Sequence, residues 1–172
     1  MISSLEEGGL VALRRNGARS FNYGAIVVGS DKANDLALLK IVNMRPDAEP
    51  WKLAGRPIES ADADNVVAIG GRLMHLGIPQ KSVTAALGDV EAVGPARSLW
   101  AGLPEKAPTG EVVKSTAPVQ RGMSGGPVFD AQNRLVGFNS FSATDSNTML
   151  SAMFPKTAVT VTKHLTTLLD KL

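Results

Sequence analysis

Cysteine is absent from the 172-residue sequence, and histidine is scarce, with only His75 and His164. The absence of cysteine excludes thiol catalysis, disulfide bonds and thiolate metal sites. It leaves the cellular compartment open, because a chain without thiols is compatible with reducing and oxidising surroundings alike. The scarcity of histidine limits the choice of a catalytic imidazole to two positions.

Long hydrophobic runs are absent too. No apolar run approaches the roughly 20 residues that a membrane helix requires, and residues 1–7 lack the basic and apolar regions of a signal peptide. Charge of one sign is not concentrated either, because 18 Lys and Arg residues stand against 16 Asp and Glu residues. We therefore expect no membrane segment in this chain and no nucleic-acid partner.

Metal and cofactor sites are not expected from the residue patterns. Asp62 and Asp64 lie close together in the sequence. Two carboxylates in an acidic segment are more often solvated, and no Asp-x-Asp-x-Asp-Gly loop surrounds them. We therefore expect no bound metal and no cofactor.

The composition is that of a globular domain, with 44% hydrophobic and 20% charged residues. Short stretches rich in Val and Ile alternate with clusters of Gly, Pro, Asn and Asp, which predicts an all-β fold. The expected strands are 10–13, 25–28, 36–42, 65–69, 83–93, 111–115, 127–129, 134–140 and 150–154. Apolar residues near one face from Lys156 to Leu172 predict a C-terminal helix.

Three connecting segments have their own sequence signals. Asn16-Gly17 predicts a hairpin turn between the first two strands, because both residues tolerate positive φ. Segment 43–64 is rich in proline and acidic residues and predicts the link between two halves of the chain. Segment 94–110, with its glycines and prolines, predicts a long surface loop.

The strongest chemical signal is a serine set among glycines, in the motif R-G-M-S-G-G-P at 121–127. A serine nucleophile must be presented on a tight turn. There, the backbone N–H of Ser124 and that of Gly122 can stabilise the oxyanion of a tetrahedral intermediate. Glycines leave room for both the turn and a substrate. From these residues alone, the alternative is an ordinary glycine-rich hairpin turn.

Three further segments form an ordered pattern with this motif. Residues 133–140 read N-R-L-V-G-F-N-S, and residues 25–40 end in D-L-A-L-L-K, which begins at Asp35. A third segment runs from Asn65 to Gly88 and contains V-V-A-I-G-G and V-T-A-A-L-G. Together the four segments resemble the HtrA/Deg branch of the trypsin-like serine proteases, with a departure after Gly70, where that branch has Asn-Pro.

The resemblance implies a fold and an activity. The fold is a chymotrypsin-like double β-barrel with an incomplete first barrel and a C-terminal helix. Residues 1–58 would hold the remainder of the first barrel and the start of the linker, and residues 59–172 the second barrel and the helix. The implied activity is that of a serine endopeptidase acting on peptide or unfolded protein substrates. The implied location is the periplasm or another compartment outside the cytoplasm.

The resemblance also implies roles for individual residues. Ser124 is the nucleophile, Asp35 is the acid that orients the base, and the backbone of Gly122 belongs to the oxyanion hole. The implied substrate-binding residues are Thr116, Asn139, Ser140, Ser151 and Ala152. Since no acidic residue stands at these pocket walls, we expect a small or medium apolar side chain before the cleaved bond.

The catalytic histidine is missing from this pattern. The family places its base ahead of the aspartate, which corresponds to Met1–Leu5 or just before, and no histidine lies there. We expect His75 to be a partly buried loop residue and His164 to face solvent on the terminal helix, so neither is expected to replace the base.

Three interpretations remain open. In the first, the protein is an HtrA-like endopeptidase whose base lies outside this sequence, and an N-terminal segment or a partner chain completes the first barrel. The 172-residue chain is then expected to be weakly active or inactive alone. In the second, it is a pseudoprotease that binds peptides or acts as a scaffold or regulator. The third, an unrelated β-barrel binding module, is the least favoured, because it requires four ordered matches by accident.

Overall fold

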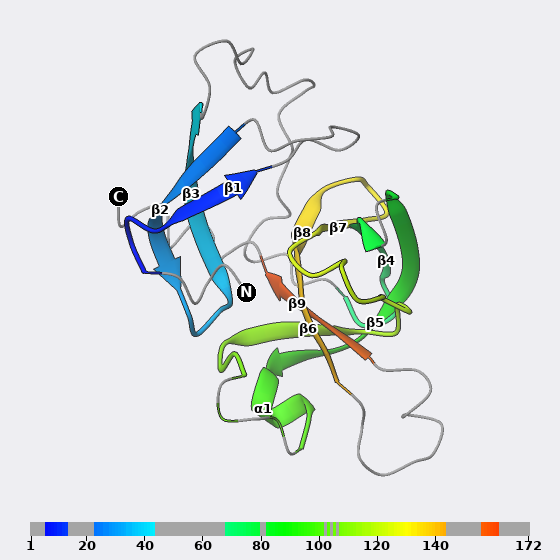
Figure 1. Ribbon diagram of the computed structural model, residues 1–172. Coiled ribbons are helices and arrows are strands. Elements are labelled where there is room, and N and C mark those ends of the chain that lie inside the picture. Colours follow the sequence, from blue (N-terminus) through cyan, green and yellow to red (C-terminus); the bar gives the residue numbers. More distant parts are fainter. Residues whose placement is uncertain are drawn as a thin grey trace.

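The described part of the chain forms a three-stranded sheet beside a closed six-stranded barrel (Figure 1). The computed structural model describes residues 6–13, 23–43, 68–79, 82–101, 103, 105, 107–143 and 156–161. The expected all-β architecture is therefore confirmed, as two β units of which the first is a sheet and the second a closed barrel. The expected boundary between residues 58 and 59 lies outside the described residues.

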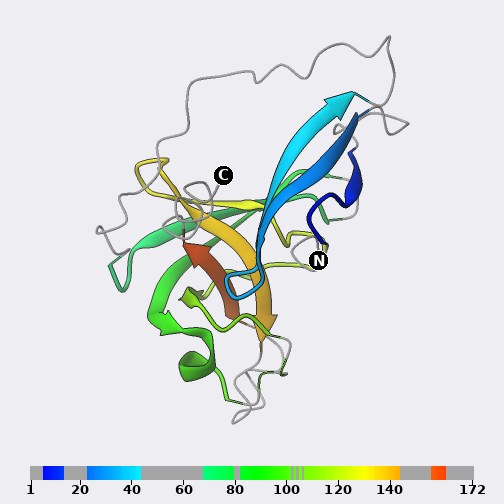
Figure 2. The same ribbon diagram turned by 90° about the vertical axis from the view of Figure 1, so that its left-hand side faces the viewer.

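The open sheet is antiparallel throughout, with the middle strand paired on both sides. Its strands are β1 (Leu10–Leu13), β2 (Tyr23–Asp31) and β3 (Leu36–Asn43). The sequence of β2 is rich in small and β-branched residues, which suit a central strand covered on one face. Figure 2 shows β2 and β3 as a long twisted pair that rises away from the barrel.

The barrel closes in the order β4-β5-β6-β9-β8-β7, with β7 returning to pair with β4. Its strands are β4 (Arg72–Gly77), β5 (Thr84–Pro95), β6 (Glu111–Ser115), β7 (Pro127–Asp130), β8 (Leu135–Ala143) and β9 (Lys156–Val161). The inward-facing side chains form a compact aliphatic core of Leu73, Val90, Val113, Val128 and Val136, each at most 2% exposed. Closure leaves this unit without a free strand edge.

Two strands differ from the expectations. The first strand of the barrel is β4, whereas a strand was expected at 65–69; of that stretch, the described residues 68 and 69 are not in a strand. The helix expected to begin at Lys156 is wrong over its first turns, since Lys156–Val161 is β9 and pairs with both β6 and β8. β-branched residues at 157, 159, 160 and 161 suit a strand with neighbours on both sides. Residues 162–172, where the rest of that helix was expected, lie outside the described residues.

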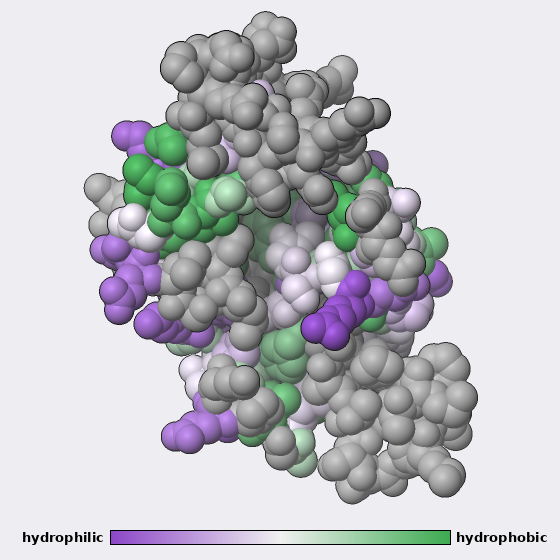
Figure 3. Space-filling view, viewed as in Figure 1, coloured by the Kyte–Doolittle hydropathy of each residue, from purple (hydrophilic) through white to green (hydrophobic). Residues whose placement is uncertain are grey.

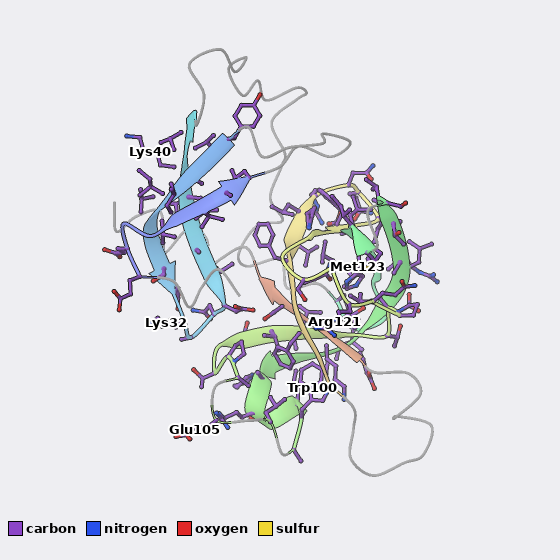
Figure 4. The ribbon with its side chains drawn as sticks, in the orientation of Figure 1. Lys32, Lys40, Trp100, Glu105, Arg121 and Met123 are labelled. Atoms are coloured by element: carbon purple, nitrogen blue, oxygen red, sulfur yellow. The ribbon has the colours of Figure 1, made fainter. Side chains whose placement is uncertain are left out.

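The expected surface loop at 94–110 is partly wrong. It begins with the end of β5 and the short helix α1 (Ala96–Leu99), and Trp100 after the helix is 2% exposed. The indole lies beside α1 (Figure 4), where its ring centroid is 5.4 Å from that of Phe141. The segment therefore covers one side of the barrel with an apolar cluster. No helix in the described part of the chain has the length and apolarity that crossing a membrane requires.

The hairpin between β7 and β8 is closed by a short-range ion pair. The Arg134 Nε donates to Asp130 Oδ2 over 2.8 Å, and the backbone N–H groups of Gln132 and Arg134 donate to Asp130 Oδ1. Burial alone would raise the pKa of Asp130, but these hydrogen bonds and the Arg134 charge outweigh it and lower the pKa. The turn thus determines how β8 runs back, antiparallel, along β7, the strand that follows the serine motif.

The open sheet docks on the barrel through the turn between β2 and β3. The backbone N–H groups of Thr109 and Gly110 both donate to the carbonyl of Ala33, over 3.0 and 2.9 Å. Inside the turn, the Asp31 carboxylate accepts from the backbone and side-chain amides of Asn34. This turn carries Asp35 at its end, so the docking contacts position one of the candidate catalytic residues.

Candidate active site

The serine motif forms a tight turn on the rim of the barrel, immediately before β7. The backbone N–H of Met123 donates to Gln120 O, and that of Gly126 donates to Met123 O over 3.0 Å. β8 holds the other side of the turn, because Gly125 N–H donates to Asn139 O over 2.6 Å and Asn139 N–H donates to Gly126 O. Ser124 is therefore presented between two anchored residues, and its side chain is exposed.

Two glycines of the motif are required by this geometry. Gly122 adopts φ +99°, a conformation that L side chains rarely occupy. Gly126 lies so close to β4 that a Cβ atom there would fall on the carbonyl oxygen of Leu76. Met123, in contrast, anchors the turn with a side chain that is fully buried against Ala86 and Ala117 (Figure 4).

The oxyanion hole is expected to consist of two backbone N–H groups. Among the described residues, no hydrogen bond engages the backbone N–H of Gly122 or that of Ser124. Both residues lie at the surface. Because both N–H groups lie at the surface, a ligand oxygen can approach the donors on each side of Met123.

Asp35 ends the turn between β2 and β3 with φ +55°, which Asp tolerates better than most residues. It is half-buried, and its Oδ2 accepts a 2.6 Å hydrogen bond from the hydroxyl of Ser140. This bond links the open sheet to the barrel. A charge-assisted bond of this length fixes one carboxylate oxygen in a defined orientation.

Adjacent residues of β8 connect the serine turn with the aspartate. Asn139 faces the inside of the barrel and is 2% exposed, whereas Ser140 points outward to Asp35. The pairing of β8 with β9 shifts register between Asn139 and Phe141, so Ser140 occupies a β-bulge. Bulges re-aim a side chain locally. Here, one strand positions both the expected nucleophile and the expected acid.

His75 does not lie in a loop, contrary to the expectation. It belongs to β4, points into the barrel and has no exposed surface. Its Nδ1 lies 2.7 Å from Asn139 Oδ1, and its Nε2 lies 3.0 Å from Ser115 Oγ. Burial lowers the pKa of His75, and the hydrogen bond with Asn139 only partly offsets this. With both ring nitrogens engaged inside the barrel, His75 is not placed to take a proton from Ser124. His164 lies outside the described residues.

The expected substrate-binding residues fall into three groups. Thr116 is exposed after the end of β6, and its Oγ1 accepts from Asp89 N–H over 2.9 Å. Asn139 and Ser140 direct their side chains to partners within the protein. Ser151 and Ala152 lie outside the described residues.

Sequence reasoning missed the interior residues that support the site. Met123 occupies a variable position of the serine motif, and His75 and Ser115 belong to no motif, yet all three have no exposed surface. One signal was present: Leu73 and His75 alternate with less buried residues, as expected for one inward face of a strand. The described residues contain no group of three or more His, Asp or Glu side chains that could hold a metal ion.

The sequence was compared with those of known protein families. The family of the trypsin-like peptidase domain matches residues 7–138, a stretch that includes both Asp35 and Ser124. The chain belongs to the trypsin-like peptidase family. The fold of the family is thus present, with its serine motif on the barrel and its aspartate segment on the open sheet. No match was found among curated proteins.

Solved structures of trypsin-like peptidases share this fold. The active form of the Rv3671c protease of M. tuberculosis has 25% sequence identity and a TM-score of 0.61, over 87% of this chain and 58% of that one. An HtrA-type protease, AlgW, solved with a decapeptide, has 24% identity and a TM-score of 0.58, over 82% and 37%. A serine endoprotease from Yersinia pestis has 21% identity and a TM-score of 0.59, over 87% and 44%. The trypsin-like chain described here thus spans less than two thirds of each of these three proteins.

Proposed function

We propose that this trypsin-like domain is the nucleophile-bearing and acid-bearing part of an HtrA-like serine endopeptidase. Ser124 is the nucleophile, Asp35 the acid, and the N–H groups of Gly122 and Ser124 form the oxyanion hole. The imidazole base comes from outside these 172 residues, on a further segment of the protein or on a partner chain. The observation that carries this proposal is the arrangement on β8, where Asn139 binds the serine turn and Ser140 binds Asp35.

The chemistry that fits these groups is acyl transfer. Ser124 Oγ attacks the carbonyl carbon of a peptide bond while the base accepts its proton. The negative charge that develops on the carbonyl oxygen is stabilised by the free N–H groups of Gly122 and Ser124. The C–N bond then breaks, the base returns the proton to the leaving amine, and water hydrolyses the acyl-enzyme. Asp35 orients the base and stabilises its cationic form.

The proposed substrate is a peptide or an unfolded protein segment. The related AlgW protease was solved with a decapeptide, which supports peptides as the ligand class for this site. Acidic side chains are absent from the described candidate walls, at Ser115–Ala117 and Asn139–Phe141. We therefore expect a small or medium apolar side chain before the cleaved bond.

A second candidate function is supported by the state of His75. Because both of its nitrogens bind groups inside the barrel, the described residues supply no base for Ser124. A pseudoprotease that binds peptides at this site, without cleaving them, is consistent with that observation. The two functions differ in the reactivity of Ser124 in the full-length protein.

Labelling with a fluorophosphonate separates the two functions. In the endopeptidase, the full-length protein reacts at Ser124, and Ser124→Ala abolishes the label. Ser98→Ala is the matched control, because Ser98 is an exposed serine on α1, away from the motif; it should leave labelling unchanged. A full-length protein that is folded and binds peptides but shows no labelling would establish the pseudoprotease instead.

A further inference from the structure

A buried hydrogen-bond network lies directly beneath the serine turn. His75 is enclosed by barrel strands, with Ala86 of β5 and Val128 of β7 as its register partners. Its polar contacts are Asn139 on one side of the ring and Ser115 on the other. A histidine without exposed surface is costly to bury unless both ring nitrogens are satisfied, so the network needs a defined set of proton positions.

The hydrogen-bond partners determine which nitrogen of His75 carries the proton. The side-chain amide of Asn139 donates to Leu76 O over 3.1 Å and to Met123 O over 3.2 Å. Its Oδ1 is therefore an acceptor, and Nδ1 of His75, 2.7 Å away, must be the donor. Nε2 is then the acceptor for the Ser115 hydroxyl, whose oxygen accepts from the backbone N–H of Ala117 over 3.2 Å. Every member is satisfied when the imidazole is neutral and protonated on Nδ1.

The network controls the orientation of the Asn139 amide. If the Asn139 amide rotated by half a turn, its NH₂ group would face the Nδ1–H of His75, and its oxygen would face the carbonyls of Leu76 and Met123. Neither pairing is possible between two donors or two acceptors. The two carbonyls and the Nδ1–H of His75 thus favour the same single orientation, in which Asn139 binds the carbonyl of Met123, the residue before Ser124.

We propose that His75 is a positioning residue for the nucleophile turn. Its Nδ1–H orients Asn139, and Asn139 holds the turn by its side-chain amide at Met123 and by its backbone at Gly125 and Gly126. The same contacts tie the turn to Leu76 at the end of β4. His75 thus aims Ser124 and its neighbouring N–H groups without contacting a substrate. The proposal rests on the proposed function only in treating Ser124 as the nucleophile.

Two substitutions of His75 separate positioning from simple packing. An Asn side chain places its amide nitrogen where Nδ1 of histidine lies, whereas a Gln side chain places its amide where Nε2 lies. His75→Asn therefore retains the donor to Asn139 and loses the contact with Ser115. His75→Gln retains a partner for Ser115 and loses the donor to Asn139. Val136→Ala is the matched control, because it creates a cavity in the barrel core and removes no hydrogen bond.

The experiment measures the turn directly in the full-length protein. Amide hydrogen exchange of Gly125 and Gly126, global stability in urea and the fluorophosphonate labelling rate of Ser124 are compared for the wild type and the three variants. After correction for global stability, His75→Gln should exchange at these two amides about tenfold faster than Val136→Ala, because a local contact is lost. Labelling of His75→Gln should slow in proportion, and His75→Asn should stay close to the wild type in both measurements.

Several results would overturn the proposal. One is equal exchange and labelling in His75→Gln and His75→Asn, or equal behaviour of His75→Gln and Val136→Ala. Another is a nitrogen NMR spectrum of His75 that shows the proton on Nε2. Failure of the proposed function gives a different pattern, in which wild-type Ser124 does not label but the exchange difference between the two His75 variants is still present.

Discussion

Ser124 stands on a closed barrel, whereas Asp35 stands on a turn of an open sheet. The serine turn is held by the fully buried Met123 and by three hydrogen bonds to Asn139, all within one closed unit. The contacts of the aspartate turn with the barrel include the Ser140 hydroxyl bond and the two bonds to Ala33 O. The internal geometry of the nucleophile is thus fixed by a core, while its relation to the acid depends on contacts between two units.

The same contrast is visible in the burial of apolar side chains. The barrel core residues are at most 2% exposed, and in the three-stranded sheet Ala25 and Val27 of β2 are equally buried, whereas Leu10 of β1 is 63% exposed and Ile41 of β3 is 41% exposed. Apolar residues gather on the surface over the open sheet (Figure 3). The exposed leucine and isoleucine therefore contribute little to folding, because an apolar side chain that stays in contact with water gains little from the hydrophobic effect.

The largest expected effect comes from breaking the contact between the serine turn and β4. Gly126→Ala places a methyl group on the carbonyl oxygen of Leu76, so either the turn or the strand must move. We expect a loss of about 3 kcal/mol or more in the free energy of unfolding, comparable to other severe steric changes in a core. Urea denaturation of the purified variant measures this loss.

Gly70→Ala is the matched control for that experiment. Gly70 has φ +83° and open space around its Cα, so the substitution adds backbone strain without a clash. The expected loss is about 1 kcal/mol. If both variants lose the same free energy, the close approach of the turn to β4 has no special weight in stability.

A second prediction compares the truncation of a buried leucine with the truncation of an exposed one. Leu73→Ala removes a side chain with no exposed surface from the barrel core and should cost about 2–5 kcal/mol. Leu10→Ala removes a side chain that is mostly exposed and should cost less than about 0.5 kcal/mol. Thermal or urea unfolding of both variants measures the difference. A large loss in Leu10→Ala would show that the open sheet is covered in solution.

Much of the fold followed from local sequence pattern. Seven strands lie where Val-rich and Ile-rich stretches predicted them, for example 36–42 in β3 and 111–115 in β6. β4 was missed because its residues, R-L-M-H-L-G, have weak strand propensity, and its pairing with β5 and β7 decides its conformation. β9 was mistaken for a helix because apolar spacing over a short segment fits both periods.

The candidate site, like the fold, could be predicted from the sequence only in part. The glycine-rich turn around Ser124 was recognisable, because the positive φ values at Gly122 and Gly125 favour glycine locally, although the close approach of Gly126 to Leu76 was not. The partners of Asp35 and His75 were not, since Ser140 and Asn139 are 105 and 64 residues away in the sequence. Contacts across that separation depend on which strands pair, which no local pattern reveals.

The link between the two units can be weakened at one hydroxyl group. Ser140→Ala removes the donor to Asp35, and a hydrogen bond to a charged group contributes about 1.5–3 kcal/mol. We expect a loss near the lower end of that range, because the half-buried carboxylate can regain water. Amide exchange in the turn of residues 32–35 should accelerate, while that of Gly125 and Gly126 should not. Thr116→Val is the control, since it removes a hydroxyl that bonds within the barrel.

The smallest expected effect is a pH dependence of stability that arises from His75, inside the barrel. Burial holds the pKa of His75 below its ordinary value, so the unfolded chain takes up this proton at a higher pH than the folded chain. The stability that this difference supplies is present above about pH 6.5 and is lost as the pH falls, by at most about 1.4 kcal/mol per pH unit. None of the four barrel residues that face His75 is titratable: Ala86, Val128, Ser115 and Asn139.

Urea midpoints between pH 5 and 7 isolate the contribution of His75. The lowered pKa of Asp130 adds a slope of the same sign, but only below its ordinary range, near pH 4, outside this window. His75→Asn should flatten the dependence between pH 5 and 7, whereas His164→Gln should retain it. A slope that survives in His75→Asn would place the titrating group elsewhere. A slope that disappears there would show that the interior beneath Ser124 tolerates the neutral imidazole and not the cation, as the proton positions in the network require.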